Sequence, residues 1–160
     1  KMLRIREVIE KAVHFEFEIE AGDFSNAGYA SSKIKKILKQ LNLPNSVIKR
    51  AVVASFESEV NVIGHSYGGT LAIDIEKNRL HITVTDTGPG IEDVDLAMSE
   101  GYSTATEEIQ EMCFGAGMGL PNIKKNTDYL DIRSAPGDHT EIEMFINFDS
   151  EQNSSEDESQ

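Results

Sequence analysis

Three polar residues recur at four-residue intervals between positions 57 and 65. Glu57, Asn61 and His65 are each one helical turn apart, so a helix would place all three on one face. The amide oxygen of Asn61 is the hard type of ligand that Mg²⁺ prefers, and the Glu57 carboxylate can accept a proton from a hydroxyl group or water. A solvated helix face would show the same spacing, so the triple alone leaves both interpretations open.

A second group, Asp86-Thr-Gly88-Pro-Gly90, directly follows an apolar strand pattern that places Asp86 at the edge of a sheet. The two glycines let the backbone approach a flat ligand closely. A buried carboxylate requires a hydrogen-bond donor, and the exocyclic amine of adenine is one. An ordinary turn with Asp as its first residue fits the same letters.

Alternating glycines form the third group and lead into a predicted helix. Gly115, Gly117 and Gly119 would expose successive backbone N–H groups, which together with a helix N-terminus favour a bound anion. No Gly-Lys-Ser/Thr ends this loop and it lacks the dinucleotide GxGxxG, so it is neither a Walker loop nor a Rossmann turn.

The order and spacing of the three groups resemble the Bergerat ATP-binding fold of gyrase-type ATPases, Hsp90 chaperones, histidine kinases and mismatch-repair ATPases. The resemblance covers about residues 12–147. It implies that Asn61 holds Mg²⁺, that Asp86 meets the adenine amine, and that Thr140 supports this contact. The family usually writes Gly-x-Gly-Thr before that threonine, whereas this chain has Gly137-Asp-His-Thr140.

The same resemblance implies a wider nucleotide site with a glycine-rich lid over the phosphates. Its implied nucleotide-binding residues are Asn61, Asp86, Gly88, Gly90, Gly115, Gly117, Met118, Gly119, Leu120 and Thr140. Further candidates for the lid or for phosphate contacts are Ser103, Thr104 and Lys124.

Within that superfamily, Glu57, Asn61 and His65 form the pattern Glu-x-x-x-Asn-x-x-x-His. This pattern resembles that of the bacterial anti-sigma serine kinases of partner-switching modules. The resemblance implies ATP-dependent phosphorylation of a serine or threonine on an antagonist protein, with Glu57 as the base. It also implies a sigma factor as a second possible partner, and it allows a homodimer formed through a sheet edge. An alternative is a regulator that uses ATP only to sequester its partner.

A serine hydrolase is a remote alternative. Gly64-His-Ser66-Tyr-Gly68 fits the G-x-S-x-G elbow, and Asp131 and His139 follow in the order that a hydrolase triad needs. The elbow requires a helix after the serine, whereas the apolar residues downstream of Ser66 recur at every second position and predict a strand.

Hydrophobic periodicity predicts the elements that position these residues. Alternation predicts strands from Val13, near 71–76, near 80–85, at 129–133 and at 141–146, and it leaves His14 and His81 on solvated faces. Helical spacing predicts helices at 27–41, from a cap at Asn45 or Ser46 to about 66, at 94–99 capped by Asp93, and at 119–126. The resulting fold class is a two-layer α/β sandwich with a mixed, mostly antiparallel sheet and helices on one face.

Composition narrows the class of protein further. The 160 residues include 28 acidic and 15 basic ones, a net charge of −13 that argues against direct nucleic-acid binding or an anionic membrane patch. One cysteine, Cys113, excludes an internal disulfide or a multi-cysteine metal site. We expect one domain over residues 1–148, a disordered acidic tail over 149–160, and a cytoplasmic location.

Overall fold

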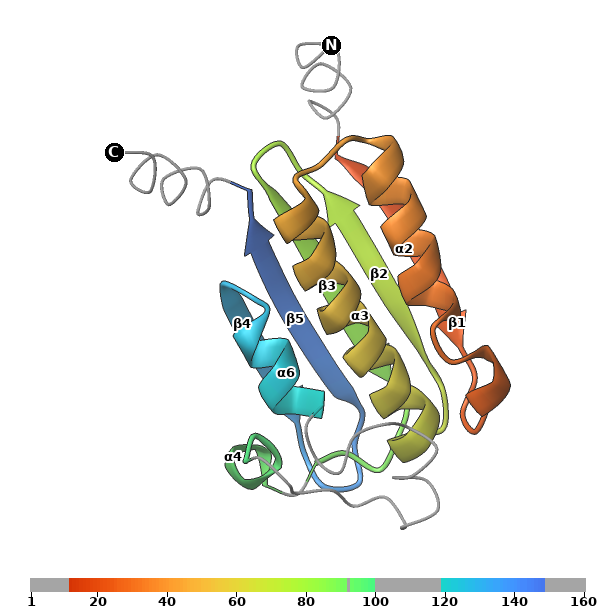
Figure 1. Cartoon of the computed structure of the whole chain (residues 1–160). Coiled ribbons are helices and arrows are strands. Elements are labelled where there is room, and N and C mark those ends of the chain that lie inside the picture. Colours follow the sequence, from red (N-terminus) through yellow and green to blue (C-terminus); the bar gives the residue numbers. More distant parts are fainter. Residues whose placement is uncertain (1–11, 92, 100–118, 149–160) are drawn as a thin grey trace.

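The computed structural model describes residues 12–91, 93–99 and 119–148, and they form a sheet covered on one face by helices (Figure 1). The strands are β1 (Val13–Ile19), β2 (Gly69–Ile75), β3 (Arg79–Asp86), β4 (Tyr129–Ser134) and β5 (Thr140–Asn147). The helices are η1 (Phe24–Asn26), α2 (Tyr29–Gln40), α3 (Asn45–His65), α4 (Val94–Ala97) and α6 (Gly119–Lys125). The predicted two-layer α/β sandwich is therefore confirmed.

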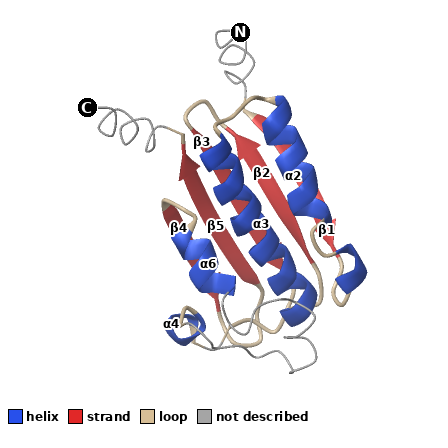
Figure 2. Cartoon of the chain, viewed as in Figure 1, coloured by secondary structure: helices blue, strands red, loops and turns tan. Residues whose placement is uncertain are grey.

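The sheet has the strand order β1-β2-β3-β5-β4, and every neighbouring pair of described strands is antiparallel. β3 is the central strand, and Asp86 is its last residue. Asp86 therefore lies where the central strand ends and not on an edge strand. In Figure 2 the helices α2, α3 and α6 all lie in front of the strands. The ends of β3 and of α3 meet at one end of the molecule, which is where the predicted site residues belong.

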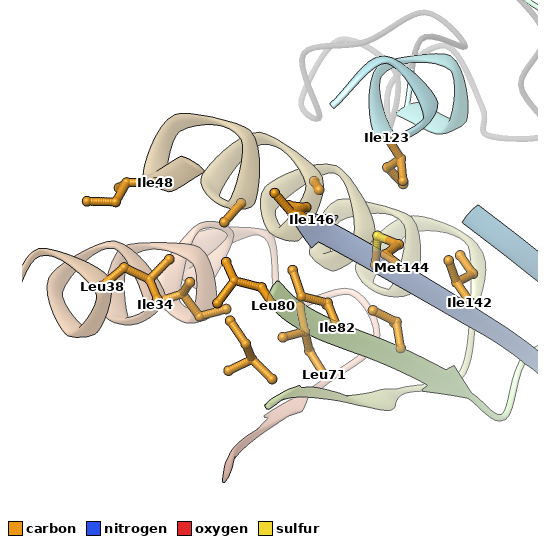
Figure 3. Close-up of a cluster of buried hydrophobic side chains, with 14 of the residues drawn as sticks. Ile34, Leu38, Ile48, Leu71, Leu80, Ile82, Ile123, Ile142, Met144 and Ile146 are labelled. Atoms are coloured by element: carbon orange, nitrogen blue, oxygen red, sulfur yellow. The ribbon is translucent and has the colours of Figure 1, made fainter. Parts of the chain in front are cut away.

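Alternation along the strands builds the core between the two layers. Leu71, Ile82 and Met144 come from three neighbouring strands, and each is at most 1% exposed because every second side chain points toward the helices. Figure 3 shows these side chains meeting Ile34 and Leu38 of α2 and Ile123 of α6. Burial of this apolar surface is the main force that holds the helices on the sheet.

The start of α3 differs from the prediction. The helix begins at Asn45, so Asn45 is a helical residue and Pro44 takes the N-cap position, without a side-chain capping bond. Pro44 has φ −55° and ψ 139°, the non-helical backbone that an N-cap residue takes, and its ring has no polar atom that could cap the helix. The predicted cap of α4 is confirmed, because the Leu96 N–H donates to Asp93 Oδ1 at 3.0 Å.

The N-terminus of α2 is capped by a side chain from another helix. Glu59 of α3 is 3% exposed, and its carboxylate accepts hydrogen bonds from the Ala30 N–H at 3.0 Å and the Ser31 N–H at 3.3 Å. These are two of the N–H groups that a helix cannot satisfy internally. Glu59 therefore fixes α2 to α3 by a charge-assisted contact between elements.

Replacing Glu59 with alanine is expected to lower the free energy of unfolding by about 3 kcal/mol, because two buried N–H groups lose a charged acceptor. Urea denaturation followed by circular dichroism measures this loss. Glu20→Ala is the matched control, since Glu20 is an exposed glutamate near the same helix end, and it should change stability by less than about 0.5 kcal/mol. Equal losses in the two variants would contradict the capping role.

The sheet face away from the helices carries two histidines, and only one of them matches the solvated prediction. His14 is exposed, and hydrogen bonds to Glu16 and Asp74 raise its pKa above the ordinary value. His81 is only partly exposed, stacks on Phe145 with a centroid separation of 4.4 Å, and lies 3.0 Å from Glu143. The prediction was wrong for His81 because alternation gives a side chain's face but not its cross-strand neighbours.

Several predictions concern parts of the chain outside the described residues. The acidic tail over 149–160, Cys113 and most of the predicted lid lie there. Among the described helices, none combines the length and the apolar character needed to cross a bilayer.

Candidate functional site

One face of α3 carries two of the three polar residues that the spacing selected, and it meets the first residue of α6. A Cβ atom added to Gly119 would lie 3.1 Å from Asn61 Oδ1 and 3.4 Å from Glu57 Oε2. The structure thus brings Glu57, Asn61 and Gly119 together, although 58 positions separate Asn61 from Gly119 in the sequence. A glycine at this point leaves space beside the two polar side chains that any other residue would fill.

Glu57 is held in a defined orientation by a residue that the sequence analysis did not select. Asn122 of α6 donates from Nδ2 to Glu57 Oε1 at 3.2 Å. This contact engages one carboxylate oxygen, while Oε2 is the oxygen nearest to the Gly119 position. Asn122 fixes the base candidate in the same way that an orienting group fixes a catalytic base in other enzymes.

His65, the third member of the triple, lies in the last turn of α3 and is half-buried. Burial lowers its pKa below the ordinary value of 6.5, so the imidazole is neutral at pH 7. A neutral ring adds no charge to this end of the helix.

Asp86 occupies the second part of the site, at the end of β3. Its Oδ1 accepts hydrogen bonds from the Gly88 N–H at 2.9 Å and the Thr140 N–H at 3.2 Å. Among the described residues, none donates to Oδ2. The carboxylate is therefore oriented by backbone donors through one oxygen and can accept a ligand donor with the other.

The neighbours of Asp86 form a row across four strands. Asp86 of β3 lies directly opposite Gly69 of β2 on one side and Thr140 of β5 on the other. Ser134 of β4 lies opposite Thr140 and completes the row. Thr140 is 4% exposed, and its hydroxyl lies 2.7 Å from the Ser134 hydroxyl. The Ser134 oxygen also accepts from the Ile91 N–H at 2.8 Å, so this hydroxyl pair connects Thr140 to the loop after Asp86.

Glycines around Asp86 are required by close backbone approach. A Cβ atom on Gly88 would lie 2.7 Å from Ser66 Cα, at the end of α3. Gly90 has a φ of +78°, and an added Cβ would run into the Ala135 carbonyl oxygen. A Cβ on Gly69, which the sequence analysis did not select, would run into the Thr85 carbonyl oxygen. These three glycines allow β2, the loop after β3 and the β4–β5 turn to converge on one carboxylate.

The contact between Gly88 and Ser66 relates the two parts of the site. Ser66 directly follows His65, and Asn61 is five residues back along α3, which is about 7–8 Å along the helix axis. Figure 1 shows the end of α3, the start of α6, the end of β3 and the start of β5 at the same end of the molecule. Asp86 and the Glu57–Asn61 face are therefore two sides of one region.

The remaining predicted residues fall into two groups. Leu120 is 8% exposed and belongs to the hydrophobic core, and Lys124 is exposed in the last turn of α6. The lid candidates Ser103, Thr104, Gly115, Gly117 and Met118 lie outside the described residues.

The hydrolase alternative does not fit the structure. Ser66 donates its hydroxyl to the Val62 carbonyl oxygen at 2.8 Å, and the strand β2 follows it instead of the required helix. Asp131 pairs with Arg133 at 2.9 Å, and His139 pairs with Asp138 at 2.9 Å. The three residues therefore do not form a nucleophile–base–acid chain.

The fold and these motifs define a family of ATPases. The family model described as "Histidine kinase-, DNA gyrase B-, and HSP90-like ATPase" matches residues 48–150, and the chain belongs to this family. The resemblance inferred from the motif order is therefore confirmed. Membership implies that the chain binds ATP.

Individual relatives narrow the comparison. The chain is 32% identical over 124 residues to the anti-sigma F factor of Caldanaerobacter subterraneus subsp. tengcongensis, covering 74% of this chain and 83% of the relative. It is 31% identical over 124 residues to the anti-sigma F factor of Thermoanaerobacter pseudethanolicus, with the same coverage. It is also 30% identical over 115 residues to the serine/threonine-protein kinase RsbT of Bacillus subtilis, covering 69% of this chain and 80% of that kinase.

Proposed function

We propose that this protein is an ATP-binding anti-sigma regulator that phosphorylates a serine or threonine hydroxyl on an antagonist protein. One observation supports this most strongly: Glu57 and Asn61 share a face of α3 against Gly119, in the same region as the oriented carboxylate of Asp86. Relatives named as anti-sigma F factors and as a serine/threonine kinase support the same class of function.

Adenine recognition is assigned to Asp86. Oδ2 can accept the exocyclic amine, because the backbone bonds to Gly88 and Thr140 already satisfy Oδ1. The Thr140 backbone N–H fixes the carboxylate, and the paired hydroxyls of Thr140 and Ser134 brace the loop beside it. Gly88 and Gly90 let the loop after β3 pack closely against the end of α3 and the β4–β5 turn, which keeps Asp86 in position.

Magnesium is assigned to Asn61, and the residues present fit it. Asn61 Oδ1 is a hard oxygen donor, and the space beside it is the one that a Cβ on Gly119 would fill. Bound Mg²⁺ would neutralise phosphate charge in a protein whose net charge of −13 otherwise repels ATP.

Proton acceptance is assigned to Glu57. Asn122 holds Oε1, which leaves Oε2 to take the proton of the attacking hydroxyl. The hydroxyl oxygen then bonds to the γ-phosphorus as the bond from that phosphorus to ADP breaks, and ADP leaves with the bridging oxygen. The role of Asn122 is to keep the carboxylate aligned during this transfer.

Replacing Glu57 with glutamine is expected to slow phosphate transfer by about 100-fold or more while ATP affinity changes less than about threefold, because an amide cannot accept the proton. The measurement is transfer of labelled phosphate to the antagonist protein of the same organism, with calorimetry for ATP. Glu76→Gln, at the distant β2–β3 turn, is the matched control and should leave both quantities unchanged.

Two outcomes would contradict the proposal. Unchanged transfer in Glu57→Gln would remove the base assignment. Nucleotide-dependent capture of the antagonist by the wild-type protein, with no phosphate transferred, would instead favour a regulator that only sequesters its partner.

A further inference from the structure

One segment of this acidic protein carries basic residues and no acidic ones. Residues 24–56 contain no aspartate or glutamate, although the whole chain has 28 acidic residues and 15 basic ones. The same segment carries six of the basic residues: Lys33, Lys35, Lys36, Lys39, Lys49 and Arg50.

The structure places four of these side chains on the outer surface of α2. Lys33, Lys35, Lys36 and Lys39, here called the lysine face, are all exposed. The other side of α2 is buried through residues such as Ile34 and Leu38, so the lysine face cannot turn inward. Figure 1 shows α2 at the flank of the helical layer, where α3 is its helical neighbour.

The lysine face has no counter-charge among the residues that the structure describes. Among the described residues, none of its four lysines makes an ion pair, and the one described contact of their side chains places Lys33 Nζ 5.6 Å from the ring centroid of Tyr29. Arg50, in contrast, pairs with Asp128 at 3.2 Å. Lysines three and four positions apart on a helix repel each other, and no carboxylate of the described residues relieves that repulsion.

An exposed aromatic side chain, that of Tyr29, lies at the N-terminus of α2. Tyr29 is 57% exposed and lies one turn before Lys33. Exposed tyrosines are frequent anchors of protein–protein interfaces, and clustered charges steer a partner of opposite sign and set its orientation. Tyr29 and the lysine face together have the composition of a docking surface.

We propose that Tyr29 and the lysine face bind a short carboxylate-rich segment of a partner protein. This inference rests on the proposed function only in that the chain acts on another protein, and it uses no residue of the nucleotide site.

The surroundings of α2 favour a short segment over a long polyanion. The helix has 12 residues and is about 18 Å long, which limits the basic surface to that length. At its start, Tyr29 borders a hollow that is also lined by Glu18, Glu20, Asp23 and Glu59. Nucleic acid or an anionic membrane would extend past Tyr29 onto these carboxylates, whereas a short peptide segment that lies over the lysines and ends at Tyr29 would not.

The test titrates the isotope-labelled full chain with a synthetic peptide of alternating glutamate and serine, followed by NMR. We expect amide shifts along α2 that weaken as salt is added, and none with the matching glutamine–serine peptide. Lys36→Glu should weaken peptide binding about tenfold, and Lys33→Glu/Lys36→Glu should weaken it further. Lys77→Glu is the matched control, since Lys77 is exposed at the β2–β3 turn and the change in net charge is equal.

Three results would overturn the inference. The first is equal weakening in Lys36→Glu and Lys77→Glu. The second is a short DNA duplex or an anionic vesicle that shifts the α2 amides at lower concentration than the peptide does. The third is a shift of the α2 backbone amide signals, without any peptide, in a variant whose acidic residues over 149–160 are replaced by asparagine or glutamine. The chain's own tail would then be the occupant of the lysine face. The replacements are Asp149→Asn, Glu151→Gln, Glu156→Gln, Asp157→Asn and Glu158→Gln.

ATP affinity, measured on the same samples, separates this inference from the proposed function. The lysine variants should bind ATP like the wild type. A protein that binds ATP but not the acidic peptide contradicts the docking surface alone, whereas one that binds the peptide but not ATP contradicts the nucleotide site alone.

Discussion

Asp86→Asn is expected to weaken ATP binding by about 100-fold, as measured by isothermal titration calorimetry. Asparagine keeps an oxygen for the Gly88 and Thr140 N–H donors, so the local fold is retained. The second oxygen becomes an NH₂ group, which places a donor against the donor amine of adenine. Loss of a charge-assisted bond together with an unpaired donor costs about 3 kcal/mol, which corresponds to that factor.

The control for this experiment removes the same charge from a nearby turn. Asp138 lies in the β4–β5 turn, 65% of its side chain is exposed, and it pairs with His139. Asp138→Asn should leave ATP affinity within about twofold, since an exposed pair contributes little. If Asp86→Asn and Asp138→Asn bind ATP equally well, adenine is not read by Asp86.

Gly90→Ala is expected to lower the free energy of unfolding by about 3 kcal/mol or more and to weaken ATP binding as well. The backbone of Gly90 has a φ of +78°, where a side chain costs about 1–2 kcal/mol. The added Cβ would also lie 2.9 Å from the Asp138 carbonyl oxygen and run into that of Ala135, so the loop and the turn must separate. Chemical denaturation measures the stability, and calorimetry measures the binding.

Gly137 separates the cost of the positive φ from the cost of the steric clash. Its φ of +77° is nearly the same, but a Cβ built there would have no atom of the described residues beyond its chain neighbours within 4 Å. Gly137→Ala should therefore cost about 1–2 kcal/mol, the conformational part alone. If the two alanine variants lose the same stability, close packing of Gly90 against the β4–β5 turn contributes nothing.

Local pattern predicted the elements well because burial here follows short periods in the sequence. Alternation located the strands, since β2, β3 and β5 bury every second residue against the helices and β1 alternates between less and more exposed residues. Four-residue spacing placed Glu57 and Asn61 on the face of α3 that meets α6. The first residue of α3 was harder to predict, because Pro44 takes the N-cap position in place of the polar residues Asn45 or Ser46.

The residues that support the site could not be predicted in this way, because their partners are distant in the sequence. Asn122 bonds Glu57 across 65 positions, and Glu59 caps α2 across 28 and 29 positions. Ser134 and Gly69 matter only because the strand register sets them in one row with Asp86 and Thr140. Single-residue chemistry did not distinguish any of these four from ordinary surface or turn residues.

The position of β5 between β3 and β4 has a consequence during synthesis on the ribosome. The backbone donor at Thr140 reaches Asp86 only after β5 has been inserted beside β3. At about 5–20 residues per second, the carboxylate waits several seconds after its own translation before that donor emerges. A nascent chain that ends before β5 therefore lacks the Thr140 donor and the strand that holds Ser134 in the row. If Asp86 binds adenine as proposed, nucleotide would stabilise the chain only after β5 has emerged.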